Sequence, residues 1–320
     1  MINRQTALEI LNANADSLPN LIEQAYQLRT KYKGNRVSIQ LLTNVRSGNC
    51  TQNCAYCAQS RDSAAPIEKY RYVEDKKLYG DNDLVDEMHL ARHCIGLSGI
   101  RFADDDIEKL AERIRKMKKN DTQICCSIGF LTEKQALILK EAGLNRINHN
   151  LNSSRRFYPS ICTTHTYQER IDNLKMLKGL GFEICSGGII GMGETWQDRI
   201  DMALDLQRLG IESIPINALM PIPGTPLEHR PQLSADDILR TIALFRFINP
   251  TANIRLAAGR KLLPENGATA FLTGASASIT GNMLTTSGTT IKEDMQMLHD
   301  LGLTNQDEDC RAATGTCGAR

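Results

Sequence analysis

Short apolar runs alternate with segments of helical periodicity along most of this chain. Apolar positions that repeat every three to four residues indicate helices, whereas short β-branched runs between turn residues indicate strands. On this basis we expect strands at residues 37–44, 92–97, 122–128, 145–151, 183–190, 213–219, 253–257 and 277–280. We expect helices at residues 73–88, 105–118, 132–142, 166–180, 196–209, 234–247, 263–272 and 291–301, after a helical segment at about residues 4–32.

This alternation predicts an α/β fold. Strands that alternate with helices favour a parallel sheet. Eight strand–helix units favour a closed (β/α)₈ TIM-type barrel over an open sheet. No repeat or linker marks a second domain, so we expect one barrel domain over residues 1–304, including the N-terminal helical extension. The stretch 305–320 is rich in Gly, Thr, Ala and Asp, which is typical of a flexible tail.

Polar residues occupy alternate positions on several expected strands. Successive side chains on a strand point to opposite faces, so one face can be polar while the other stays apolar. A barrel of this type normally fills its interior with branched apolar side chains. A recurring polar face therefore predicts an inner cavity for a ligand or metal, and residues on that face include Cys94, Cys125, Cys185 and Arg255. The alternative is a scatter of buried polar residues with partners of their own, since burial without partners costs several kcal/mol.

Composition and charge narrow the function classes. The 320 residues carry 38 basic and 37 acidic side chains, and the net charge of +1 gives no reason to expect nucleic acid or an anionic membrane as a partner. No signal peptide is visible, and no apolar run approaches the roughly 20 residues of a membrane span. We therefore expect a cytoplasmic protein whose ten cysteines bind metal or act in catalysis rather than form disulfides.

One cysteine motif points to a specific chemistry. Cys50, Cys54 and Cys57 follow the first expected strand in a single short loop, and Tyr56 precedes the third cysteine. Thiolates are the usual ligands of iron–sulfur clusters, and a [4Fe–4S] cluster normally takes four. Three cysteines leave one iron open, where S-adenosylmethionine (SAM) can chelate it and be cleaved to a 5′-deoxyadenosyl radical. The alternative is a zinc site or a set of reactive thiols.

The segment from Cys50 to Cys57 resembles the radical SAM signature, and residues 35–303 resemble the biotin synthase family. The second resemblance rests on several motifs in order, which are more specific together than any one alone. They lie at residues 148–151, 163–170, 185–195, 213–217, 254–260 and 281–286. The fold that this resemblance implies is a (β/α)₈ barrel, usually in a homodimer.

The resemblance also implies an activity. The family inserts sulfur between two unactivated carbons of dethiobiotin to form biotin, and two deoxyadenosyl radicals abstract the two hydrogens in turn. The sulfur comes from an auxiliary cluster, [2Fe–2S] or larger, held deep in the barrel by three cysteines and an arginine. In this chain the corresponding residues are Cys94, Cys125, Cys185 and Arg255. The implied partners are an electron donor of the flavodoxin or ferredoxin type and cluster-assembly proteins.

Further site residues follow from the resemblance by position. Asn150 and Asn217 are expected to hydrogen-bond the ureido ring of dethiobiotin. Arg170 and Asn152 are expected to contact SAM, with Tyr56 near its adenine. Two glycines are expected either to let the backbone approach the cofactor closely or to form a plain tight turn, namely Gly191 and Gly193.

Some positions depart from the family's pattern. Asn152 stands where the family commonly has an aspartate, and the lost charge predicts altered rather than absent SAM binding. Cys126 follows Cys125, so the ligand assigned there can be off by one residue. Cys162 is expected to be a buried or loop thiol rather than a ligand. The tail contains two more cysteines, Cys310 and Cys317. One interpretation is that they load or stabilise the auxiliary cluster, which would make it larger than [2Fe–2S]. The other is that they are idle thiols.

Two other kinds of function stay open at this point. A related radical enzyme, such as a hydrogenase-cofactor maturase or a methylornithine-type mutase, would need no sulfur-donor cluster. A non-catalytic iron–sulfur carrier would need no enclosed polar cavity. The complete set of residues for the auxiliary cluster argues against the first, and the polar inner face argues against the second.

Overall fold

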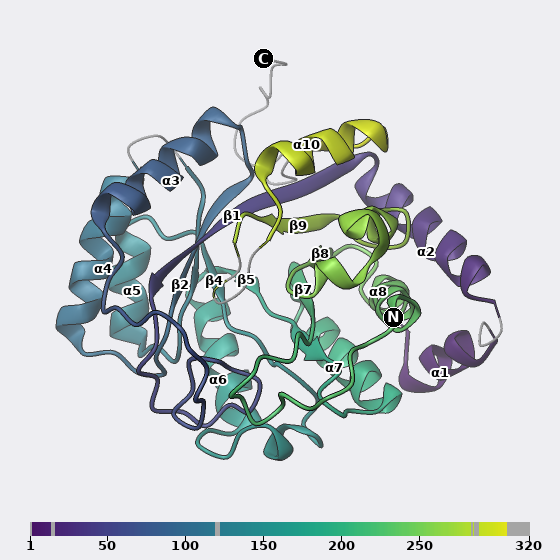
Figure 1. Cartoon of the computed structure of the whole chain (residues 1–320), viewed down its shortest axis with the longest axis horizontal. Coiled ribbons are helices and arrows are strands. Elements are labelled where there is room, and N and C mark those ends of the chain that lie inside the picture. The colour runs from purple at the N-terminus through teal and green to yellow at the C-terminus, as the bar shows by residue number, and fades with distance from the viewer. Residues whose placement is uncertain (1, 14–16, 119–121, 283, 285–287, 306–320) are drawn as a thin grey trace.

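The computed structural model describes residues 2–13, 17–118, 122–282, 284 and 288–305, and it shows a central barrel of strands ringed by helices (Figure 1). The strands are β1 (Arg36–Arg46), β2 (Arg92–Leu97), β3 (Ile124–Ser127), β4 (Arg146–Asn148), β5 (Glu183–Cys185), β6 (Gly188–Ile190), β7 (Ser213–Ala218), β8 (Asn253–Leu256), β9 (Ala277–Thr280) and β10 (Thr304–Asn305). The helices are α1 (Arg4–Ala13), α2 (Leu18–Lys33), α3 (Asp75–Glu87), α4 (Asp104–Met117), α5 (Glu133–Glu141), α6 (Tyr167–Gly179), α7 (Trp196–Arg208), α8 (Ala235–Ile248), α9 (Ala268–Phe271) and α10 (Ile291–Asp300).

The predicted eight-stranded parallel barrel is confirmed. Neighbouring strands pair in the order β1, β2, β3, β4, β5, β7, β8, β9, and β9 closes the barrel by pairing with β1. The predicted strand at residues 183–190 is divided into β5 and β6, and β6 also pairs with β7. The division includes Gly187, where a Cβ atom would lie 2.0 Å from the carbonyl oxygen of Pro215. Only glycine permits the two backbones to approach so closely.

The two faces of the barrel strands differ as the sequence predicts. Ile95, Cys126, Ile147 and Ile184 are fully buried in the main apolar core between the strands and the helices. The opposite face carries the cysteines and polar residues that line the interior. Because side chains alternate along a strand, a single register places one set outward and the other inward.

Local sequence signals set the starts of several helices that surround the site. Capping boxes, in which the threonine and the third helical residue bond to each other's backbone N–H, begin four of them. These helices are α5, α6, α7 and α10, with Thr132, Thr166, Thr195 and Thr290 as the capping residues. The cap at Thr166 places Arg170 in the first turns of α6, and the cap at Thr195 follows directly on the loop after β6.

The structure corrects some predicted elements. The helix expected at residues 263–272 is a 3₁₀ turn (Pro264–Gly267) followed by the short α9, because Glu265 and Asn266 have positive φ. The helical segment at 4–32 is two helices, α1 and α2. Asn305, placed in the tail by the sequence, belongs to β10 and pairs with Val37. Cys310 and Cys317 lie outside the described residues. Among the described helices, none is long and apolar enough to span a membrane.

Candidate functional site

The first cysteine set, Cys50, Cys54 and Cys57, lies in the loop after β1, as predicted. The motif contains a tight turn, because the backbone N–H of Cys57 donates to the carbonyl oxygen of Cys54 at 3.1 Å. Cys54 is buried, whereas Cys50 and Cys57 are half-buried. Burial raises the pKa of the Cys57 thiol to about 11. Binding of a metal at this thiol therefore releases a proton, because the thiolate is the ligand.

The second cysteine set comes from three strands. Cys94 on β2, Cys125 on β3 and Cys185 on β5 form one buried cluster inside the barrel. Cys94 and Cys125 are register partners on neighbouring strands. Cys126, the other candidate at this position, is buried on the opposite face in the main core. The structure therefore brings Cys125, not Cys126, to the other two cysteines.

Arg255 lies with this second set, as the strand pattern predicts. Its Nη1 donates to the carbonyl oxygens of Ser38 at 3.1 Å and Ser278 at 2.9 Å, and its Nε donates to Ser213 Oγ at 3.4 Å. The Cys185 thiol donates to the same Ser213 Oγ at 3.4 Å. Ser213 thus joins the arginine to one of the three cysteines.

The second set lies in a positively charged part of the interior. A hydrogen bond from the Cys94 thiol is the main reason that the pKa of Cys125 lies below its usual range, and three guanidinium groups add to the effect, those of Arg146, Arg92 and Arg255. Arg92 and Arg146 each also bind Glu183 Oε2 through Nη2 at 2.7 Å. Three thiols among three guanidinium groups are a donor set whose surroundings compensate negative charge, which fits an anionic iron–sulfur cluster.

One cavity of about 360 Å³ connects the two cysteine sets. All three cysteines of the first set line it, together with Cys94 and Arg255 of the second. The lining also includes polar residues from strands, loops and α6, namely Tyr56, Asn148, Asn150, Asn152, Arg170 and Asn217. A molecule in this cavity can therefore reach both cysteine sets without leaving the barrel.

The predicted substrate asparagines line the cavity and brace its wall. Asn150 Oδ1 accepts from the backbone N–H of Gly187 at 3.0 Å. Asn217 bridges two segments, because its Nδ2 donates to Gly188 O at 3.1 Å and its Oδ1 accepts from Ala258 N at 3.2 Å. These bonds hold both amides in place, which suits groups that must present fixed polar atoms to a ligand.

The predicted SAM residues have different environments. Asn152 has a φ of 67°, a left-handed conformation that asparagine tolerates better than most residues, and its carbonyl oxygen accepts from Ile189 N at 2.9 Å. Arg170 lines the cavity but already donates to three protein groups, the Tyr158 hydroxyl, Asn150 O at 3.0 Å and His165 Nε2 at 2.9 Å. Its guanidinium is therefore held by the protein before any ligand enters.

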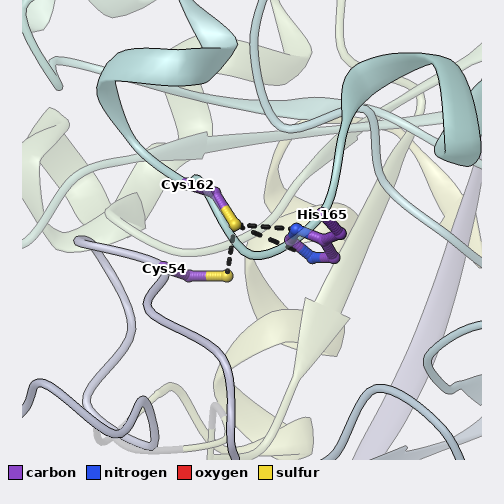
Figure 2. Close-up of side chains that lie close together, drawn as sticks. All are labelled: Cys54, Cys162 and His165. Carbon is purple, nitrogen blue, oxygen red and sulfur yellow. Dashed lines mark hydrogen bonds between the residues drawn. The ribbon is translucent and has the colours of Figure 1, made fainter.

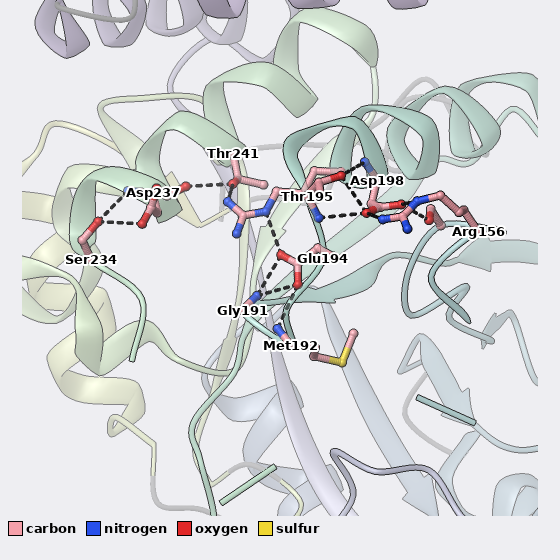
Figure 3. A network of polar contacts seen from close by, with 11 residues as sticks. Arg156, Gly191, Met192, Glu194, Thr195, Asp198, Ser234, Asp237 and Thr241 are labelled. Carbon is pink, nitrogen blue, oxygen red and sulfur yellow. Dashed lines mark hydrogen bonds and ion pairs between the residues drawn. The ribbon is translucent and has the colours of Figure 1, made fainter. Parts of the chain in front are cut away.

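Gly191 and Gly193 belong to a turn after β6, and Figure 3 shows Gly191 next to Met192 and Glu194. Both have positive φ, 92° and 110°, which explains why glycine stands at each position. The Glu194 carboxylate accepts from the backbone N–H groups of Gly191 and Met192 and pairs with Arg199 at 2.8 Å. Neither glycine is among the described residues that line the cavity, so their contact with a cofactor stays a prediction.

The structure adds site residues that the sequence did not single out. Asn148 Nδ2 donates to Cys185 Sγ at 3.3 Å, a contact consistent with its place on the polar face of β4. Ser213 lies on the polar face that the same alternation predicts for residues 213–219, although the pattern gave it no role. Cys162 and His165, in contrast, meet Cys54 from a loop more than a hundred positions along the chain, and no spacing signal predicts that contact (Figure 2).

Comparison with known proteins agrees with this geometry. Residues 44–206 match the radical SAM superfamily, and residues 215–304 match the biotin and thiamin synthesis associated domain. A biotin synthase of Alkaliphilus metalliredigens is 44% identical over 287 residues, which cover 89% of this chain and 90% of the relative. A biotin synthase of Clostridium beijerinckii is 43% identical over 286 residues, with coverage of 89% and 90%.

Solved structures show the same barrel at lower identity. Methylornithine synthase has a TM-score of 0.84 at 16% identity, covering 98% of this chain and 96% of its own. A maturase of the [FeFe]-hydrogenase has a TM-score of 0.82 at 17% identity, covering 97% and 73%. At such identity these two structures support the fold alone. The family models and the close relatives over most of their length show more: this chain belongs to the biotin synthase family of the radical SAM superfamily.

Proposed function

We propose that this chain converts dethiobiotin to biotin by radical sulfur insertion. Membership of the family implies a [4Fe–4S] cluster and SAM. The observation that carries the proposal is the single cavity lined by both cysteine sets. An enzyme that makes a radical at one end and delivers sulfur at the other needs its substrate to reach both.

The residues divide the work between the two ends of the cavity. When bound, the [4Fe–4S] cluster supplies the electron that cleaves SAM, and the auxiliary cluster supplies sulfur. Cys50, Cys54 and Cys57 would hold the first group and leave one coordination position open. The second would be held by Cys94, Cys125, Cys185 and Arg255, in surroundings that compensate negative charge.

The polar residues between the two sets would position the substrates. Asn150 and Asn217 are braced by the backbone, so their remaining polar atoms can orient the ureido ring of dethiobiotin. Asn152, Arg170 and Tyr56 line the same cavity as the first set and would hold SAM. The barrel walls keep water away from the radical, which protects it from side reactions.

The wider setting of the reaction is also part of the proposal. All eight described cysteines are free thiols, which supports a reducing compartment such as the cytoplasm. We expect the electron to come from a flavodoxin or ferredoxin, and assembly proteins to load the clusters of a homodimer. The role of Cys310 and Cys317 can be decided by replacing both with serine, and unchanged iron content and turnover would show that they are idle.

A related radical enzyme of the mutase or maturase kind is the main competitor, because its fold is the same. The second cysteine set separates the two, since neither a mutase nor a maturase of this type needs a sulfur donor. The test is anaerobic reconstitution, iron and sulfide counting, and assay with dethiobiotin, SAM and a reductant. We expect 5′-deoxyadenosine together with biotin or its thiol intermediate. Deoxyadenosine without either sulfur-containing product would contradict sulfur insertion but keep the radical chemistry.

A further inference from the structure

Cys162 and His165 form a cluster with Cys54 that neither cysteine set explains. They lie between the 3₁₀ turn Tyr158–Ser160 and α6, and the three side chains point toward one another (Figure 2). Cys162 Sγ is 3.8 Å from Cys54 Sγ and 2.7 Å from His165 Nδ1. All three residues are buried, and their ligand atoms lie within 4.8 Å of one another.

The backbone holds this cluster in place from both sides. The N–H of Ala55, next to Cys54, donates to the carbonyl oxygen of Ile161 at 2.9 Å. Asn53 Oδ1 accepts from the backbone N–H groups of Thr163 at 3.0 Å and Thr164 at 3.3 Å. The two residues that flank Cys54 are thus bonded to the residues around Cys162, so the approach of the two sulfurs is built into the loops.

The partners of His165 determine which of its nitrogens carries the proton. Arg170 Nη2 lies 2.9 Å from His165 Nε2, and a guanidinium can only donate. Nε2 must therefore accept, and in the neutral ring the proton lies on Nδ1, which faces Cys162 Sγ. The hydrogen bonds run from Arg170 to His165 to Cys162, and in this structure the Cys54 thiol also donates to Cys162 Sγ at 3.8 Å. A cysteine that binds iron does so as a thiolate and has no proton to donate, so with a cluster on Cys54 this bond must reverse, and the thiol proton of Cys162 then serves Cys54.

We propose that Cys162 is a positioning residue of the radical-generating site, whose thiol donates a hydrogen bond to Cys54 and makes reduction of the cluster bound there easier. This inference rests on the proposed function, in which Cys54 is a cluster ligand. Reduction adds negative charge that the ligand sulfurs share, and hydrogen bonds to those sulfurs stabilise it. Such partners beyond the ligands themselves are known to tune metal sites. His165 and Arg170 keep the Cys162 thiol oriented.

The same proton assignment argues against a mononuclear metal site made of Cys54, Cys162 and His165. A metal at Nδ1 would need the lone pair of that nitrogen, and the ring proton would then move to Nε2. There it would face Arg170, which has no acceptor to offer. A cation in this position would also remove Cys54 from the first cysteine set.

The test is a redox titration of the reconstituted protein, followed by electron paramagnetic resonance of the reduced [4Fe–4S] cluster. Cys162→Ala removes the donor, and we expect a lower reduction potential with an unchanged iron content. A tenfold less favourable one-electron reduction corresponds to about 59 mV. Cys162→Ser keeps a hydroxyl donor on a shorter side chain, and its reduction potential should lie between those of Cys162→Ala and the wild type. Cys126→Ala is the matched control, because it removes a buried thiol that faces the helices and should leave the potential unchanged.

Three results would overturn the inference. One is a common potential for the wild type, Cys162→Ala and Cys162→Ser. Another is an equal shift in Cys126→Ala, which would indicate a general effect of losing a buried thiol. The third is stoichiometric zinc in the protein without clusters that Cys162→Ala no longer binds, which would favour a metal site. If the wild type makes no deoxyadenosine, the proposed function fails, whereas the potentials still decide the role of Cys162.

Discussion

The two cysteine sets meet the same cavity but are built in opposite ways. Cys50, Cys54 and Cys57 share one loop, and the guanidinium near them is that of Arg170 on α6, which reaches Cys54 through a hydrogen-bond chain of His165 and Cys162. The second set comes from β2, β3 and β5 and lies among guanidinium groups. A loop can leave a coordination position open for a substrate, while rigid strands can enclose and neutralise a charged group. The difference indicates that access governs the first set and charge compensation the second.

The strongest test of this comparison is to remove one ligand from the first cysteine set, called here the loop set. In Cys54→Ala, two thiolates remain, too few to hold the [4Fe–4S] cluster and leave a defined open iron. We expect deoxyadenosine formation to fall to background, measured by chromatography after anaerobic reconstitution. The spectrum of the auxiliary cluster should persist. Loss of both clusters together would show that the two sets are not independent.

The next test removes a ligand from the second cysteine set, Cys94, Cys125 and Cys185, called here the strand set. In Cys185→Ala we expect biotin formation to be lost while SAM cleavage continues, because the radical is made at the other end of the cavity. The measurement is the ratio of deoxyadenosine to biotin in a single turnover. Cys126→Ala serves as the control, since its side chain faces the helices, and it should retain both products. Retention of biotin formation in Cys185→Ala would remove the strand set from the mechanism.

Low pH should destabilise the part of the barrel that carries the strand set, because β2 contains a buried histidine. His93 precedes Cys94 on β2 and faces outward to Thr43 and Asn82, and burial lowers its pKa to about 4. In the unfolded chain a histidine titrates near 6.5, so between these values the unfolded state binds the proton first. The contribution of neutral His93 to the free energy of unfolding is complete above about pH 6.5 and is lost as the pH falls toward 4. The loss amounts to at most about 3 kcal/mol. Urea unfolding of the protein without clusters measures it, and His93→Gln should flatten the dependence.

The smallest expected effect concerns Ser213, which supports the strand set without being a ligand. Ser213→Ala removes the shared partner of Cys185 and Arg255. Loss of such a partner typically costs about tenfold or more in metal affinity, so the auxiliary cluster should be released faster in the presence of a chelator. The potential of the [4Fe–4S] cluster should not change. A change there, without faster loss of the auxiliary cluster, would contradict the separation of the two sets.

Much of the fold could be predicted because it depends on local patterns. The apolar alternation placed the strand 92–97 at the observed bounds of β2, and threonines in capping boxes explain where helices such as α6 begin. The prediction was wrong at residues 263–272, where Glu265 and Asn266 adopt positive φ in a segment of helical pattern. The short β10 was missed because two residues carry no periodicity, and only pairing with β1 makes them a strand.

The sequence by itself determined the loop set, because the spacing of Cys50, Cys54 and Cys57 brings them together in any compact loop. It also determined which face of each strand is polar, because side chains alternate. Tertiary structure decided the rest. The registers of β2 to β5 bring Cys94, Cys125 and Cys185 together and turn Cys126 away. Packing of the loop before α6 brings Cys162 to Cys54 across a long stretch of chain, a contact that no local pattern encodes, because the two residues lie in loops after different strands, β1 and β4.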